Sequence, residues 1–146
     1  VLYCGLMWTA SGPSVIEFNA RFGDPETQVL MPRVNGDFAA FLKSAADGAL
    51  DPAAASLSDR ACVGVVLATP DYPLSSTPAV NLPPELPAPA DVHVFRGSTG
   101  GRVLTVTALA DDLASARTRA YEAVNEIMKR FGTAAGLKHR RDVAQV

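Results

Sequence analysis

Three polar side chains alternate along one short segment and together offer the groups that a nucleotide phosphate needs. Glu17, Asn19 and Arg21 are separated by single apolar residues, and in a strand of period two such positions share one face, about 6–7 Å apart in pairs. Carboxylate and amide oxygens are the hard ligands that Mg²⁺ prefers, and a guanidinium is a fixed fork for phosphate or carboxylate. This combination suits phosphoryl transfer, in which metal ions bridge the phosphates and a cation stabilises the moving group. An ordinary amphipathic strand with a solvated polar face has the same alternation, so alternation alone leaves both interpretations open.

The elements around this segment predict a hairpin. Residues 1–8 are apolar and β-prone, and residues 10–14 contain a Gly-Pro turn signal. Residues 15–22 then alternate and predict a second strand, which Gly23-Asp24-Pro25 ends. The hairpin would present the three polar side chains on one of its faces.

Short helices are predicted to follow the hairpin. Residues 27–34 form a helical turn or short helix interrupted by Pro32. Asp37 is a suitable N-cap for a helix that runs to residue 46, with Gly48 at its exit.

The second half of the chain predicts a small antiparallel sheet closed by one helix. Strands are expected at residues 61–68, buried on both faces, and at 91–95 and 102–109, which a glycine-rich turn joins. A helix begins at Asp111 or Asp112 and continues to about residue 130. Its apolar positions recur at i, i+3 and i+4 and should all face a core; they are Leu113, Ala116, Ala120, Val124, Ile127 and Phe131. Between these elements lies a long proline-rich connection, with room for a short strand at 79–82.

Composition narrows the classes of function. The 13 basic and 15 acidic residues nearly cancel, which argues against nucleic acid or an anionic membrane as a partner. The 2 cysteines are poor material for a disulfide framework and suit a reducing, cytoplasmic location. No apolar run approaches the roughly 20 residues of a membrane span, and no basic segment of a signal peptide precedes the first strand. Because Val1 stands at the start of an apolar strand, we expect the sequence to begin inside a longer protein.

The sequence motif that follows the polar strand points to a protein family more specifically than the alternation does. Residues 21–28 read R-F-G-D-P-E-T-Q and resemble the R-F-G-D-P-E-x-Q signature of glycinamide ribonucleotide synthetases (phosphoribosylamine–glycine ligases), which belong to the ATP-grasp superfamily. The preceding V-I-E-F-N strand and several later segments are similar as well; they are Tyr3-Cys4-Gly5-Leu6, residues 61–68, G-G-R-V-L-T-V-T-A at 100–108, Ala120-Tyr121 and Arg141-Asp142-Val143-Ala144. The chain departs from the family in a shorter turn after Phe95 and in the spacing of residues 133–138.

The resemblance implies an α+β fold in two parts. Residues 1–50 would be the C-terminal part of an ATP-grasp domain, and residues 51–146 a small, mostly antiparallel β domain with one packed helix. An unpaired sheet edge and an uncovered apolar face would permit a homodimer.

The resemblance also implies an activity. The family joins glycine to 5-phosphoribosylamine with ATP, through an acyl phosphate, in purine biosynthesis. Matched residue by residue, Glu17 and Asn19 fall on the ligands of Mg²⁺ (or Mn²⁺). Arg21 falls on the catalytic basic residue that holds the transferred phosphoryl group or the substrate carboxylate. We expect no turnover from this chain alone, since one strand cannot hold two metal ions.

Three further residues are candidates for substrate binding, each with a plain alternative. Asp24 and Glu26 lie in the signature, but they also suit a turn before proline and the first turn of a helix. Arg102 follows two glycines whose amides could receive a phosphate, or which simply form a hairpin turn.

Two other functions stay open from the sequence alone. One is a non-catalytic protein that keeps the C-terminal domain as a binding or scaffold module. The other is a different ATP-grasp ligase, for which the full signature is untypical. His93 and His139 have no neighbouring nucleophile or acid in sequence and predict neither a triad nor a zinc site.

Overall fold

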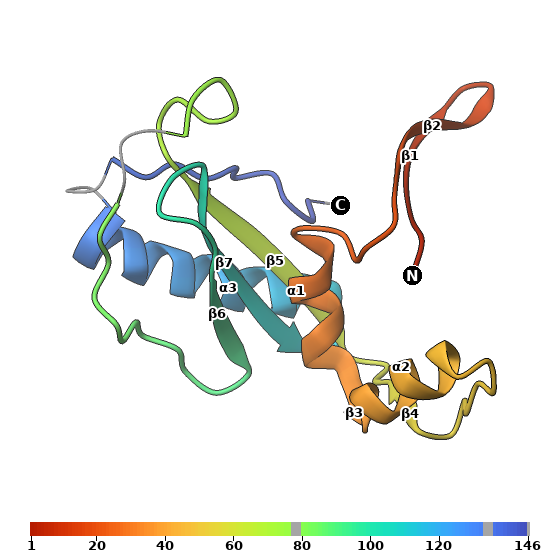
Figure 1. Ribbon diagram of the computed structural model, residues 1–146. Helices are drawn as coiled ribbons and strands as arrows, with labels where there is room; N and C mark the ends of the chain where they lie inside the picture. Colours follow the sequence, from red (N-terminus) through yellow and green to blue (C-terminus); the bar gives the residue numbers. More distant parts are fainter. Residues whose placement is uncertain (77–79, 133–135, 146) are drawn as a thin grey trace.

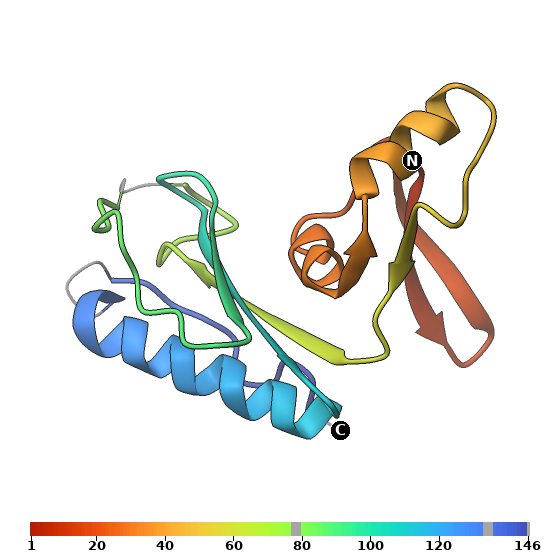
Figure 2. The ribbon, with the colours of Figure 1, turned by 90° about the horizontal axis from the view of Figure 1, so that it is seen from below.

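The computed structural model describes residues 1–76, 80–132 and 136–145 and shows an N-terminal unit (residues 1–57) and a C-terminal unit (residues 61–145) (Figures 1 and 2). The strands are β1 (Tyr3–Thr9), β2 (Gly12–Asn19), β3 (Val34–Gly36), β4 (Ala55–Leu57), β5 (Ala61–Ala68), β6 (Val92–Arg96) and β7 (Arg102–Ala110). The α-helices are α1 (Glu26–Leu30), α2 (Phe38–Ala46) and α3 (Leu113–Ile127), with a 3-10 turn at Met31–Arg33 and a π-helical turn at Met128–Gly132. This arrangement confirms the predicted α+β class.

Strands β1 and β2 form the predicted hairpin, which projects from the rest of the molecule (Figure 1). Strand β2 begins at Gly12 and ends at Asn19, so the predicted bounds of residues 15–22 were wrong at both ends. The bounds of β2 are set by its pairing with β1. Thr9 at the end of β1 pairs with Gly12, and Tyr3 at the start of β1 pairs with Asn19. Arg21 therefore lies beyond the strand, in a bend.

The hairpin carries large apolar side chains that the described chain does not cover. Trp8 is 80% exposed, and Leu6, Ile16 and Phe18 are each more than half exposed. An apolar surface of this kind is typical of an interface. Its occupant is not shown, and the homodimer stays a prediction.

The helices after the hairpin confirm the sequence-based prediction. Helix α1 gives way to the 3-10 turn that contains Pro32, and the Asp37 carboxylate caps α2 by accepting from the Ala40 amide at 2.9 Å. Strand β4 pairs with β3, so the hydrogen bonding of the N-terminal unit continues to Leu57. The boundary between residues 50 and 51 stays a prediction.

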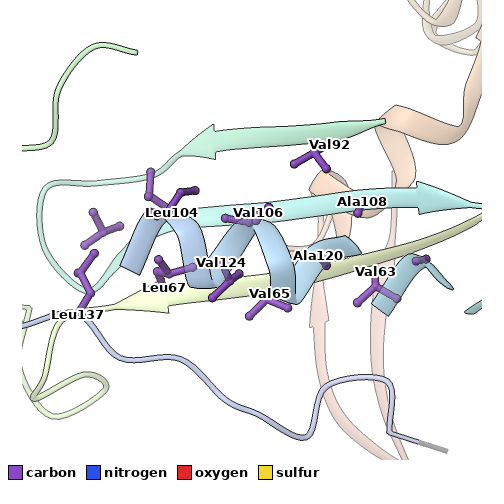
Figure 3. Packing of buried hydrophobic residues seen from close by; sticks show 14 of the residues in the cluster. Val63, Val65, Leu67, Val92, Leu104, Val106, Ala108, Ala120, Val124 and Leu137 are labelled. Carbon is purple, nitrogen blue, oxygen red and sulfur yellow. The ribbon is translucent and has the colours of Figure 1, made fainter. Parts of the chain in front are cut away.

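The C-terminal unit is an antiparallel sheet in the order β5-β7-β6 with α3 on one face (Figure 2). The register aligns Val65 with Val106 and Leu67 with Leu104 on that face, where Val124 packs against them (Figure 3). All five are at most 1% exposed. The register follows from the period of two, because it places every second apolar side chain of β5 over the helix.

Three details of this unit differ from the prediction. Strand β5 is fully buried only on the helix face for most of its length, because Cys62, Gly64 and Val66 on the other face are half-buried. Leu113 is 42% exposed because it is the first residue of α3, next to the capping residue Asp112, whereas the other predicted α3 positions from Ala116 to Ile127 are buried and Phe131 packs against the core. The strand expected at 79–82 is absent from residues 80–82, and Ala79 lies outside the described residues.

The opposite face of the sheet meets the N-terminal unit. A Cβ atom added to Gly64 would lie 2.6 Å from Cγ1 of Val29 in α1, so a glycine is needed here for the helix to approach β5. The tail runs along the free edge of β5, where Lys138 and Ala68 exchange two backbone hydrogen bonds of 2.8 Å. The predicted departure at residues 133–138 lies partly outside the described residues.

Candidate functional site

The end of the hairpin places Glu17 and Asn19 on one face. Strand β2 pairs Glu17 with Gly5 and Asn19 with Tyr3 of β1. A Cβ atom at Gly5 would lie 3.1 Å from Cγ of Glu17, so the glycine gives the Glu17 side chain its space. The Asn19 amide nitrogen is buried and has no hydrogen-bond partner among the described residues. A buried polar atom without a partner is costly and rare, which is typical of a site completed by a ligand.

A tyrosine connects this face to the signature loop (residues 21–28). The Tyr3 hydroxyl donates to Oε1 of Glu26 at 3.0 Å. This hydrogen bond raises the pKa of Tyr3 above its usual value, helped by burial and by the charges of Glu26 and Glu17, while Arg21 acts in the opposite direction. The Tyr3 hydroxyl therefore links the hairpin to Glu26 of the signature loop, within the influence of the charges of Glu17 and Arg21.

Arg21 is placed differently from the other two predicted residues of the strand face. Its side chain is exposed, and Nη1 donates to the backbone oxygen of Phe22 at 2.8 Å. It also lines a cavity of about 560 Å³ together with Asp24, Gln28 and Arg96. Arg21 thus reaches the surroundings of the signature loop, but through a bend that follows the strand.

Asp24 connects the signature loop to the C-terminal sheet. Its carboxylate accepts from Nε2 of Gln28 at 2.8 Å and forms an ion pair with Arg102 of β7, with 3.1 Å between Oδ2 and Nη2. Nη1 of Arg102 also donates to the backbone oxygen of Asp24 at 2.9 Å. The Arg102 guanidinium additionally lies 5.9 Å from the centre of the Tyr72 ring.

The glycines before Arg102 have a structural role in the turn. Gly101 has a φ of +76° and its amide donates to Oγ1 of Thr69 at 3.2 Å. A Cβ atom at Gly100 would lie 1.7 Å from the backbone oxygen of Ser76. The Gly101 amide is therefore already engaged, and the binding of a phosphate by this turn would fall to Arg102.

A cavity of about 680 Å³ borders this cluster on one side. Its lining includes Asp24, Gln28, Tyr72 and Arg102, together with serines of the segments at 75–76 and 98. Polar groups from both units converge on it, which is typical of a ligand site. The cavity joins Asp24 and Arg102, whereas Glu17 and Asn19 lie outside its lining.

The donor set fits part of a magnesium shell. Glu17 and Asn19 provide two oxygen-bearing side chains, and Mg²⁺ usually binds one or two such groups and fills the remaining positions with water and phosphate oxygens. In the part of the chain that the structure describes, no group of three or more His, Cys, Asp or Glu side chains suits a metal. These residues alone are therefore an incomplete metal site.

Sequence reasoning missed several residues near the site. Tyr3, Gln28 and Tyr72 contact predicted site residues but have no catalytic chemistry of their own to mark them. Lys138 and Arg140 of the C-terminal tail were not predicted as site residues, but they line a cavity together with Pro25 of the signature loop. A signal for Tyr3 existed in the predicted hairpin, since the pairing of two strands decides which residue faces Asn19.

Comparison with known proteins supports an ATP-grasp assignment. Residues 1–27 match the family model described as phosphoribosylglycinamide synthetase, ATP-grasp (A) domain, and residues 62–146 match phosphoribosylglycinamide synthetase, C domain. The fold and the site thus define the chain as the end of an ATP-grasp domain followed by its C-terminal domain.

The relatives are consistent with these matches. The chain is 44% identical to the phosphoribosylamine–glycine ligase of Streptomyces coelicolor over 99% of its own length and 37% of that protein. It is 39% identical to the ligases of that name from Neisseria meningitidis serogroup A and Halalkalibacterium halodurans, over 98% of this chain and 36% and 34% of those proteins. The chain belongs to the phosphoribosylglycinamide synthetase family, and it spans about a third of the length of these curated relatives.

One further finding concerns membranes. Among the described residues, no helix has both the length and the apolar character needed to cross a lipid bilayer.

Proposed function

We propose that this chain is part of a phosphoribosylamine–glycine ligase of purine biosynthesis, and that it supplies the last part of the ATP site together with the C-terminal domain. The observation that carries the proposal is the placement of Glu17 and Asn19 on one face of the hairpin, where the amide nitrogen of Asn19 is buried without a hydrogen-bond partner among the described residues, in a segment that matches an ATP-grasp domain. Relatives that bear the ligase name match nearly the whole chain.

The reaction joins two substrates at the expense of ATP. The terminal phosphoryl group of ATP passes to a carboxylate oxygen of glycine and gives glycyl phosphate and ADP. The amine of 5-phosphoribosylamine then attacks the acyl carbon, the new C–N bond forms, and phosphate leaves with loss of a proton from nitrogen. The first step replaces a poor leaving group with a good one, and water must be kept from the acyl phosphate.

The residues of this chain take three roles in that scheme. Glu17 and Asn19 would hold Mg²⁺ (or Mn²⁺), which neutralises the negative charge that develops on the phosphates. Arg21 would stabilise the phosphoryl oxygens during transfer. Asp24 would position the signature loop through its ion pair with Arg102, and Glu26 through its hydrogen bond with Tyr3. Of the three predicted substrate-binding residues, we propose a direct contact with substrate for Arg102.

The chain by itself should have no turnover, because two side-chain ligands are too few for a nucleotide with its metal ions. The sharpest test is a chimera, in which this chain replaces the corresponding third of a full-length relative such as the ligase of Streptomyces coelicolor. The chimera should form ADP only when glycine and phosphoribosylamine are both present. Glu17→Gln and Arg21→Ala should each lower kcat by roughly 10²–10³-fold.

The matched control for Glu17→Gln is Glu122→Gln, which makes the same change on the exposed surface of α3 and should leave turnover unchanged. A folded chimera that keeps its activity after Glu17→Gln and Arg21→Ala would refute these roles. A folded chimera without any activity would favour the alternative function, a binding or scaffold module that retains the C-terminal domain.

A further inference from the structure

A third cavity, of about 720 Å³, lies between the signature loop and the C-terminal tail. Val66 and Ala68 of β5 and Pro25 of the signature loop contribute apolar lining. Lys138 and Arg140 contribute from the tail. The cavity has the volume of a site for a small metabolite.

The charge of this cavity is strongly one-sided. Three cationic side chains, Arg102, Lys138 and Arg140, line it, and no acidic residue is among its described lining. His139 lines it as well, but burial lowers the pKa of this imidazole and favours its neutral form. The chain as a whole has a formal net charge of −2, so the cluster is a local feature and no part of a general basic surface. Such a concave, basic site attracts a small anion.

Ion pairs neutralise only some of these cations. Arg102 is paired with Asp24, and Arg140 with Asp142 outside the lining, with 2.9 Å between Nε and Oδ1. Lys138 has no ion-pair partner among the described residues and is exposed. Its ammonium group is therefore the cation that is available to a ligand.

The backbone that carries the tail cations is held by α3. Arg117 donates from Nε to the Val143 oxygen at 3.0 Å and from Nη2 to the Arg141 oxygen at 2.8 Å. The Tyr121 hydroxyl donates to the Arg140 oxygen at 2.8 Å and accepts from the Val143 amide at 3.1 Å. The Arg117 guanidinium lies over the Tyr121 ring, 4.7 Å from its centre.

The start of this segment is fixed as well, by the paired backbone hydrogen bonds between Lys138 and Ala68. Anchors at both ends mean that a ligand would not have to order the backbone on binding. The basic tail residues are thus presented to the cavity in advance, as a built anion site requires.

We propose that this cavity binds the phosphate group of a sugar phosphate. Lys138 supplies the free charge, Arg102 and Arg140 supply guanidinium donors at the rim, and Val66, Ala68 and Pro25 contact the carbon skeleton of the sugar. Several cationic groups from two separate segments suit a phosphate dianion with three acceptor oxygens. The volume exceeds what a bare ion needs. The identification of the sugar as the 5-phosphoribosyl group of the amine substrate rests on the proposed function, whereas the binding of a phosphate monoester does not.

The test uses the 146-residue chain and three probes, which are ribose 5-phosphate, inorganic phosphate and ribose. Titration calorimetry at low ionic strength should show binding of ribose 5-phosphate, weaker binding of inorganic phosphate and none of ribose. Lys138→Ala should weaken the binding of ribose 5-phosphate about 10-fold, which is the loss expected for one charge-assisted hydrogen bond. Lys138→Arg should keep most of the affinity because the charge is retained.

Lys129→Ala is the matched control, since it removes an exposed lysine from the π-helical turn that follows α3, outside the lining of the cavity. Circular dichroism of each variant checks that it is folded. The proposal is overturned if ribose 5-phosphate does not bind, if Lys138→Ala and Lys129→Ala have equal effects, or if inorganic phosphate binds as tightly as the sugar phosphate.

The active chimera separates this inference from the proposed function. If the chimera turns over but Lys138→Ala leaves the KM for phosphoribosylamine unchanged, the inference fails alone. If the chain binds ribose 5-phosphate but the chimera makes no product, the ligase assignment fails and the anion site stands.

Discussion

The contact between Asp24 and Arg102 links the two units of the chain, and a double-mutant cycle measures its strength. The perturbation is Asp24→Ala, Arg102→Ala and the double variant. The two residues are 78 positions apart, and the side chains are 47% and 38% exposed, with 3.1 Å between the paired atoms. A cycle on such a pair isolates the interaction from the separate effects of each substitution.

The expected coupling follows from the exposure of the pair. Exposed ion pairs contribute about 0.2–1 kcal/mol, because water screens the charges and the side chains lose freedom. Asp24 is also held by Gln28, and Arg102 by its second bond to the Asp24 backbone oxygen, which reduces the entropy lost in forming the pair. We therefore expect a coupling near the upper limit, about 1 kcal/mol, whereas Arg102→Ala alone should cost about 2 kcal/mol because it also removes the bond to the carbonyl.

Urea unfolding followed by circular dichroism gives the four free energies of unfolding. Lys43 and Asp47 are the control pair, since they are four residues apart on the surface of the N-terminal unit with side chains 75% and 56% exposed. That pair should couple by about 0.3–0.5 kcal/mol. A coupling between Asp24 and Arg102 no larger than that of the control pair would show that the contact does not hold the signature loop to the sheet.

Two further predictions concern the C-terminal unit. Leu67→Ala should lower the free energy of unfolding by about 2–5 kcal/mol, because removal of the fully buried side chain leaves a cavity. The control Leu74→Ala, at a position 95% exposed, should change it by less than about 0.5 kcal/mol. Equal losses of the two variants in urea unfolding would contradict the assigned core. The pKa of Asp91 is lowered chiefly by its hydrogen bond to Arg60, with help from Arg119. The ionised carboxylate therefore stabilises the fold at pH values above the pKa of Asp in the unfolded chain, about 3.9. This stabilisation is lost as the pH falls through the lowered pKa of the folded state. Asp91→Asn, which tolerates the φ of +64°, should accordingly be less stable than the wild type near pH 7 and equal to it at the acid end of a pH series of melting temperatures; a difference that is independent of pH would refute this.

Sequence reasoning succeeded where the deciding signals were local. The caps at Asp37 and Asp112 each depend on a hydrogen bond to an amide three residues later, and a spacing of three can be read directly. The sheet of the C-terminal unit followed in the same way from short apolar segments and from the glycine-rich turn that joins the last two strands. Leu113 was misplaced because periodicity gives the direction of a side chain but not where the partner layer ends.

The candidate site was less predictable because its geometry depends on partners distant in sequence. Whether Arg21 belongs to the strand was decided by where β1 begins, which a single alternating segment does not reveal. Arg102 binds Asp24, which is 78 positions away in the sequence, and the Gly101 amide donates to Thr69, which is 32 positions away. No local sequence pattern predicts such contacts. The residue types therefore indicated phosphate chemistry, whereas only the structure shows which of these side chains already bind a partner within the chain.

Arg102 stands between two cavities, and this position constrains how its charge can be used. It lines both the cavity that contains Asp24 and the basic cavity that contains Lys138, and Tyr72 lines both as well. A guanidinium has five donors, and the two bonds to Asp24 leave others for an anion on the basic side. An anion bound there would use these remaining donors, so its binding does not require the pair with Asp24 to break. The signature loop, which carries Arg21 and Glu26, is joined to Arg102 through Asp24, so under the proposed function the C-terminal unit would connect sugar-phosphate binding to the position of Arg21.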